Sequence, residues 1–292
     1  MTGRRVQIDV QFNPAAAPWP VFRDATLAAE AAGFGAVWVV DHLAGVSMKG
    51  TGMLECFTCL GALATTTTTI GLGTLVANVW NREPGVLAVA AASVCEIADR
   101  PLLLGLGAGT SPTSKYAAEQ HAVGATIAAT LAERHARVGV VLDLIDTMFD
   151  PDRPEQFATF PLPHHRPTTL LGVNSVRLAT LAGSRAGGVN VWWSHPRRDE
   201  FLAAADGARA TGAPFLRTAY EWWNDDLLDA QHPVRREMEA AGIDRLIVAE
   251  AGVPDPSAIA AMQPNAGARA ASFRIEPPVR PSAASAASTE RE

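Results

Sequence analysis

The 292-residue chain has few of the residues that mark several protein classes. Its three cysteines are too few for a disulfide framework, so we expect a reducing compartment. Charged residues make up only 18% and the net charge is -6, so no basic surface for nucleic acid is expected. The first residues lack the apolar segment of a signal peptide, because Gln7, Asp9 and Gln11 interrupt it. These features predict a cytoplasmic globular protein whose partner is a small molecule.

Residues 56–80 contain no charged side chain, so this stretch could be mistaken for a membrane-spanning segment. This stretch contains the five consecutive threonines 65–69 and several glycines, which disfavour a uniform apolar helix. It is therefore predicted to form a helix, a turn and a buried strand, and no membrane contact is expected.

Strand and helix patterns alternate along the chain. Residues 6–12 alternate apolar and polar side chains, a helix follows Pro18 and Pro20 and ends at Gly33, and 36–40 is an uncharged second strand. Further strands are predicted at 70–74, 102–106, 168–172, 188–191, 215–219 and 244–248, and further helices at 55–64, 84–98, 125–149, 175–185, 198–209, 232–241 and 256–262. This alternation predicts an α/β fold, a (β/α)8 TIM barrel, in preference to a doubly wound sheet.

The barrel is predicted to occupy residues 1–262 as a single domain. Alanine, proline, serine and arginine dominate beyond it, so 263–292 is predicted to be a C-terminal tail whose end is disordered.

Active sites of such barrels lie at the carboxyl ends of the strands. The residues that follow the predicted strands are mostly polar or aromatic, unlike the strands themselves. They are Phe12, Asn13, Asp41, His42, Leu75, Val76, Ala77, Asn78, Gly107, Ala108, Gly109, Thr110, Val173, Asn174, Ser175, Trp192, Trp193, Ser194, His195, Tyr220, Glu221, Trp222 and Trp223.

His42 has two interpretations on the sequence alone. It is either a structural histidine with satisfied hydrogen bonds or a group that donates or accepts a proton at the barrel mouth. The adjacent Asp41 is not expected to contact its ring, because neighbouring residues on a strand point to opposite faces.

Two glycine-containing loops have similar open interpretations. Residues 105–109 match neither G-x-G-x-x-G nor a P-loop, so they form either a tight turn or a cradle for a phosphate or ring. Residues 172–175 precede a helix and have two interpretations: the free N–H groups of the helix start bind a phosphate, or Asn174 or Ser175 serves only as the helix cap.

Metal chemistry is not predicted. Cys56 and Cys59 provide two of the four ligands of a structural zinc site, and their spacing on a helix is that of core neighbours. In each of the tryptophan pairs 192–193 and 222–223, one ring either lines a pocket or packs in the core.

Several segments together resemble one family. They are 30–34 (EAAGF), 37–43 (VWVVDHL), 55–60 (ECFTCL), 70–76 (IGLGTLV), 82–84 (REP) and 104–109 (LGLGAG). In this order and spacing, over residues 6 to about 250, the chain resembles the bacterial luciferase-like flavin and deazaflavin oxidoreductases. That resemblance implies a (β/α)8 barrel, in agreement with the strand count.

The resemblance implies a cofactor across the barrel mouth, either the deazaflavin coenzyme F-420 or FMN as the alternative. His42 matches a histidine implicated in proton transfer or charge stabilisation, and the ring would rest on Leu75 and Val76, where relatives carry a bulge with a non-proline cis peptide. The implied cofactor-binding residues are Asp41, His42, Leu75, Val76, Asn78, Gly107, Ala108, Gly109, Thr110, Val173, Asn174 and Ser175.

One departure concerns the substrate. Sugar-phosphate dehydrogenases of the deazaflavin branch carry a catalytic glutamate where this chain has Thr110, so that substrate is not expected. Phe12, Trp193, His195 and Trp222 are the predicted substrate-pocket residues. The leading hypothesis is a deazaflavin-dependent oxidoreductase that transfers a hydride with His42 as acid or base. An FMN-dependent monooxygenase and a non-catalytic flavin-binding relative are the alternatives, and a homodimer is expected.

Overall fold

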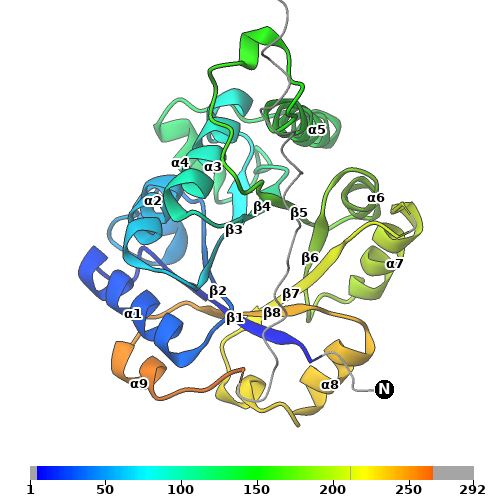
Figure 1. Cartoon of the computed structure of the whole chain (residues 1–292). Coiled ribbons are helices and arrows are strands. Elements are labelled where there is room, and N and C mark those ends of the chain that lie inside the picture. Colours follow the sequence, from blue (N-terminus) through cyan, green and yellow to red (C-terminus); the bar gives the residue numbers. More distant parts are fainter. Residues whose placement is uncertain (1–4, 211, 266–292) are drawn as a thin grey trace, which may run out of the picture.

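Eight parallel strands form a closed barrel in a computed structural model that describes residues 5–210 and 212–265 (Figure 1). The strands are β1 (Gln7–Phe12), β2 (Ala36–Val39), β3 (Gly71–Asn78), β4 (Leu102–Gly107), β5 (Thr168–Gly172), β6 (Gly188–Trp192), β7 (Leu216–Trp222) and β8 (Arg245–Glu250). Each strand pairs with the next in sequence, and β1 closes the ring on β8 in a register from Gln7 opposite Arg245 to Phe12 opposite Glu250. The predicted (β/α)8 barrel is thus confirmed.

Helices surround the barrel (Figure 1). They are α1 (Trp19–Ala32), α2 (Cys56–Thr66), α3 (Pro84–Ala98), α4 (Ala117–Ala122), α5 (Leu131–Met148), α6 (Val176–Arg185), α7 (Arg198–Ala208), α8 (Pro233–Ala240) and α9 (Pro256–Ala260), with 3-10 turns η1 (Gly45–Met48), η2 (Glu155–Phe157) and η3 (Asp225–Leu228). Within the described ranges, no helix combines the length and apolar character needed to cross a membrane.

The helix predicted at 125–149 starts later in the structure, at Leu131. Helix α5 starts after Thr130, whose side-chain oxygen accepts a hydrogen bond from the N–H of Glu133, while the Glu133 carboxylate accepts one from the N–H of Thr130. This capping box fixes the helix start. The segment before it contains Gly124 at φ +71° and the separate short helix α4, which the sequence analysis missed.

Strand β1 turns its polar face into the barrel. Asp9 accepts hydrogen bonds from the Trp38 indole N–H at 3.0 Å and from Arg245 at 2.8 Å. Trp38 packs inside the barrel with Leu170, Leu216 and other residues from strands around the ring. The apolar residues of β1 belong instead to the core between strands and helices. The alternation predicted for 6–12 is therefore real, but its apolar face points outward to the helices.

Strand β3 extends four residues beyond its predicted end and contains a bulge. The peptide bond between Leu75 and Val76 is cis, and the register with β4 shifts between Thr74 and Ala77. The bulge turns the Val76 side chain towards the glycines of neighbouring strands: a Cβ added at Gly107 would lie 2.5 Å from Val76 Cγ2. Glycine in β4 therefore makes room for the bulge.

Residues 266–292, the greater part of the predicted tail, lie outside the described residues, so its disorder and the domain boundary stay predictions. Asn265 is described, and its side chain exchanges hydrogen bonds with the backbone of Ile8 at 2.8 and 3.0 Å.

Candidate active site

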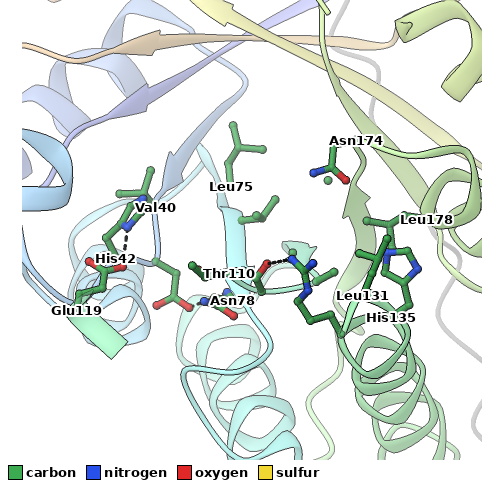
Figure 2. A pocket seen from close by; sticks show the side chains of 17 residues that line it. Val40, His42, Leu75, Asn78, Thr110, Glu119, Leu131, His135, Asn174 and Leu178 are labelled. Carbon is green, nitrogen blue, oxygen red and sulfur yellow. Dashed lines mark hydrogen bonds and ion pairs between the residues drawn. The ribbon is translucent and has the colours of Figure 1, made fainter. Parts of the chain in front are cut away.

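A cavity of about 310 Å³ lies at the carboxyl ends of β2 to β5 (Figure 2). Its volume falls at the lower end of the range typical of small-molecule sites. It is lined by Val40, Asp41, His42, Leu75, Val76, Asn78, Gly107, Ala108, Gly109, Thr110, Glu119, Leu131, Arg134, His135, Gly172, Asn174 and Leu178. All but two of the predicted cofactor residues are in this set; the exceptions are Val173, buried in the core, and Ser175, which caps α6 by accepting the N–H of Leu178.

His42 lies at one end of the cavity, against a buried carboxylate (Figure 2). Its Nδ1 is 2.8 Å from Oε1 of Glu119, and the two side chains are 24% and 4% exposed. Oε2 of Glu119 accepts a 3.2 Å hydrogen bond from the N–H of Ala44 and a 2.6 Å bond from the hydroxyl of Ser47. The ring of Tyr116 packs on the imidazole with centroids 5.0 Å apart. His42 is thus held in place while remaining partly open to the cavity.

Asp41 is held by a different set of partners. Both carboxylate oxygens accept hydrogen bonds from the Arg82 guanidinium at 2.7 Å, and the N–H of Asn78 donates to Oδ2 at 2.9 Å. Burial raises the pKa of the Asp41 carboxyl, and the bidentate ion pair with Arg82 opposes that shift. Arg82 also contacts Glu55. Asp41 and His42 lie beyond the end of β2, line the same cavity and have separate partners, and Asp41 connects β2 to β3.

The other end of the cavity carries cationic and unpaired nitrogen atoms from α5. Arg134 donates a long 3.5 Å bond to the carbonyl of Gly109, its Nε has no hydrogen-bond partner, and it pairs with no carboxylate of the described residues. Both ring nitrogens of the buried His135 also lack partners. Burial, together with the charges of Arg177 and Arg134, lowers the pKa of His135. Asn174, which precedes α6, lies on the same side (Figure 2).

The middle of the cavity is formed by the β3 bulge. Leu75 lies between the His42 end and the Asn174 end (Figure 2), and Val76, the next residue of the bulge, also lines the cavity. Added Cβ atoms at Gly107 and Gly172 would meet the methyl groups of Val76 at 2.5 and 2.8 Å. Gly109 has φ +92°, a left-handed conformation that favours glycine. The site therefore has an apolar middle and two polar ends.

Comparison with known proteins identifies the family. The sequence model described as luciferase-like monooxygenase matches residues 6–220, well over half of the chain. The chain belongs to the luciferase-like monooxygenase family. Because the members of this family are oxidoreductases, the protein is an enzyme of that class.

Solved structures share the fold of this luciferase-like protein at low sequence identity. An F-420-dependent secondary alcohol dehydrogenase in complex with an F-420–acetone adduct is 14% identical, with a TM-score of 0.68, over 91% of this chain and 99% of that one. The coenzyme F-420-dependent tetrahydromethanopterin reductase of Methanopyrus kandleri is 15% identical, with a TM-score of 0.62, over 90% and 98% of the two chains. The monooxygenase RslO1 of Streptomyces bottropensis is 16% identical, with a TM-score of 0.64, over 88% and 96%.

The substrate-pocket residues predicted for this luciferase-like protein do not line the cavity described above. Phe12 and Trp193 are buried in the core, where Phe12 meets the ring of Phe22 edge-on. The Nδ1 of His195 accepts the N–H of Arg197, and Trp222 is 54% exposed. Their role in binding a substrate stays a prediction.

Three polar residues of this luciferase-like site escaped the sequence analysis: Glu119, Arg134 and His135. They lie on α4 and α5 rather than directly after a strand, so the positions of the strand ends do not predict them. A usable signal was the long polar segment between β4 and α5, which is longer than a simple connection requires.

Cys56 and Cys59 are buried free thiols of α2. Burial raises the pKa of Cys59 to about 12 and that of Cys56 well above its usual value, so both thiols are protonated core side chains.

Proposed function

We propose that this protein is a deazaflavin-dependent oxidoreductase that transfers a hydride between coenzyme F-420 and a small organic substrate. The observation that carries the proposal is a single cavity with His42 at one end, the β3 bulge in the middle and anion-binding groups at the other end. The fold similarity to two F-420-dependent enzymes is compatible with a deazaflavin as the cofactor.

The residues present fit such a group. The two ring nitrogens of His135, one of which is a donor in the neutral ring, and the Nε of Arg134 are buried with no partner among the described residues, which leaves donors for a bound anion. The backbone before α6 adds free N–H groups and the positive end of a helix dipole. Arg134, His135 and Asn174 would hold the phosphate, and Leu75, Val76 and the glycines of β4 and β5 would contact the ring.

When bound, the deazaflavin supplies two-electron hydride chemistry, so the protein's task is to bind, orient and manage protons. His42 would donate or accept the proton at the substrate atom through Nε2, since its Nδ1 is committed to Glu119. Asp41, which is committed to Arg82 and Asn78, would keep β2 and the β3 bulge in register and take no proton. Thr110 lines the cavity and has no carboxyl group, which argues against sugar-phosphate oxidation.

Titration of the purified protein with F-420 and, separately, with FMN tests the proposal. We expect saturable binding of F-420, followed by cofactor fluorescence, and weaker binding of FMN. Saturable FMN binding without F-420 binding would overturn the deazaflavin assignment.

The second candidate is an FMN-dependent monooxygenase. The description of the matching family and the fold similarity to RslO1 favour it. Oxygen consumption with reduced FMN, and none with F-420, would support this alternative. The homodimer and the cytoplasmic location expected from the sequence remain proposals, which size measurement in solution and cell fractionation would test.

A further inference from the structure

We propose that Glu119 is the positioning residue of His42: it fixes the ring in the Nδ1–H tautomer, so that Nε2 is the atom that exchanges a proton in the cavity. This inference rests on the proposed function in one respect only, the use of His42 as acid or base. The arrangement of the pair itself is a property of the protein without cofactor.

The first argument is the set of donors around the Glu119 carboxylate. Oε2 already receives the N–H of Ala44 and the hydroxyl of Ser47. In an ionised carboxylate both oxygens can only accept, and the two donors at Oε2 match that form. Oε1, 2.8 Å from His42 Nδ1, is then an acceptor as well, so Nδ1 must carry a proton.

The second argument is the position of the other ring nitrogen. In a neutral imidazole with a proton on Nδ1, Nε2 holds a lone pair. Nε2 of His42 has no hydrogen-bond partner in the part of the chain that the structure describes, and the side chain lines the cavity. It can therefore take a proton from a group bound there and return it.

The third argument is rigidity. The side chain of Glu119 is 4% exposed, and its two oxygens bind His42 directly and the η1 loop after β2 through Ala44 and Ser47. Tyr116, just before α4, packs against the ring. Since α4 follows β4 and His42 follows β2, Glu119 joins two βα segments at one point. An ionised partner also stabilises the imidazolium once Nε2 has taken a proton.

The experiment reads the tautomer directly from imidazole 15N chemical shifts of the cofactor-free protein, at a pH where the ring is neutral. In the wild type we expect a protonated Nδ1 and an unprotonated Nε2 for His42. The opposite tautomer in the wild type would overturn the inference without the need for any variant.

Glu119→Gln then removes the charge while keeping the size. We expect the His42 ring to populate both tautomers and kcat to fall about tenfold or more. The Kd of the cofactor should change little. Glu119→Asp, which keeps the charge on a shorter side chain, should recover part of kcat. An Nδ1–H signal and a kcat that are both unchanged in Glu119→Gln would contradict the inference.

Two variants distinguish the effect of Glu119 on the His42 ring from its effect on the η1 loop. Ser47→Ala removes the hydroxyl bonded to Oε2 but leaves the His42 contact, so the tautomer should persist. Glu30→Gln alters a carboxylate that binds three backbone N–H groups at the start of β3 and contacts no histidine, and it too should leave the tautomer intact. Tautomer loss in Ser47→Ala would mean that the order of the η1 loop holds the ring, and tautomer loss in Glu30→Gln would mean that a general loss of stability is enough to release it; either result would contradict the inference.

The two proposals fail in different ways. If neither F-420 nor FMN binds, the proposed function fails while the tautomer measurement still stands. If the cofactor binds and turns over but the wild-type ring is protonated at Nε2, only the positioning role of Glu119 fails.

Discussion

In the proposed function, proton transfer and cofactor binding belong to side chains at opposite ends of the cavity. His42 lies against Glu119 at one end, and His135 and Asn174 lie at the other, with Leu75 between them (Figure 2). Arg134, the neighbour of His135 on α5, donates to the carbonyl of Gly109. Substitutions at the two ends should therefore affect different kinetic constants.

His42→Ala should reduce turnover by about a hundredfold or more, the usual contribution of a general acid or base, while the Kd of the cofactor changes little. Steady-state assays and fluorescence titration measure the two quantities. His164→Ala, at an exposed position of the loop before β5, is the matched control and should behave as wild type. A full rate in His42→Ala would refute the role of His42.

Arg134→Gln should raise the Kd of the cofactor by about ten- to a hundredfold, since hydrogen bonds to charged groups contribute roughly 1.5 to 3 kcal/mol. The kcat at saturating cofactor should remain close to wild type. Isothermal titration calorimetry measures the affinity, and Arg166→Gln, in a half-exposed surface ion pair, is the control. Equal cofactor affinities of the two variants would show that Arg134 does not bind the phosphate.

At the scale of elements, the bulge of β3 and the glycines of β4 and β5 depend on one another. Gly107→Ala should reduce the free energy of unfolding by about 1 to 3 kcal/mol, because its Cβ would lie 2.5 Å from Val76 Cγ2. The loss should be smaller in a Val76→Ala background, which removes that methyl group and leaves Cβ of residue 76 at 3.5 Å.

Chemical denaturation of the four proteins of this double-mutant cycle measures the coupling. Gly139→Ala on α5 is the control, since an added Cβ would meet no described atom within 4 Å outside its own helix backbone and alanine favours a helix. An equal cost of Gly107→Ala in both backgrounds would contradict the steric explanation.

Glu30 connects the end of α1 to the start of β3. Burial opposes its ionisation, but hydrogen bonds from the N–H groups of Thr69, Ile70 and Thr68 outweigh this and lower its pKa to about 2 from 4.5. A carboxyl with a depressed pKa in the folded state stabilises the protein fully above about pH 4.5, and this contribution disappears as the pH falls towards 2.

Glu30→Gln should therefore lower the free energy of unfolding at pH 7 and have a smaller effect near pH 3. Urea denaturation of both proteins at the two pH values measures this. A destabilisation that grows as the pH falls would show that another group causes the acid sensitivity.

For the whole molecule, the repeated strand and helix patterns were enough to predict the barrel. Buried parallel strands such as 168–172 have uninterrupted apolar sequences, and local turn residues mark their ends. The orientation of β1 was harder to predict, because its polar residues face Trp38 and Arg245, which are distant in sequence.

The same distinction applies to the site. Residues at strand ends, such as His42 and Asn78, were predicted because topology alone brings strand ends together. Glu119 could not be predicted in this way. Its contact with His42 joins residues 77 positions apart and depends on the path of a short helix that has no strong periodic signal. The positions of Arg134 and His135 in the cavity likewise depend on how α5 packs beside the barrel mouth.

The polar layer of Asp9, Trp38 and Arg245 inside the barrel has a kinetic consequence. Together with Leu170 and Ile247, this layer packs the interior of the barrel within the described residues, so we expect the reactants to enter from the end where the cavity lies. Both reactants must then use the same entrance, and whichever occupies the deeper part must arrive first and leave last. We expect initial-velocity and product-inhibition patterns of a compulsory-order mechanism, with the coenzyme as leading reactant; random-order patterns would point to a second entrance.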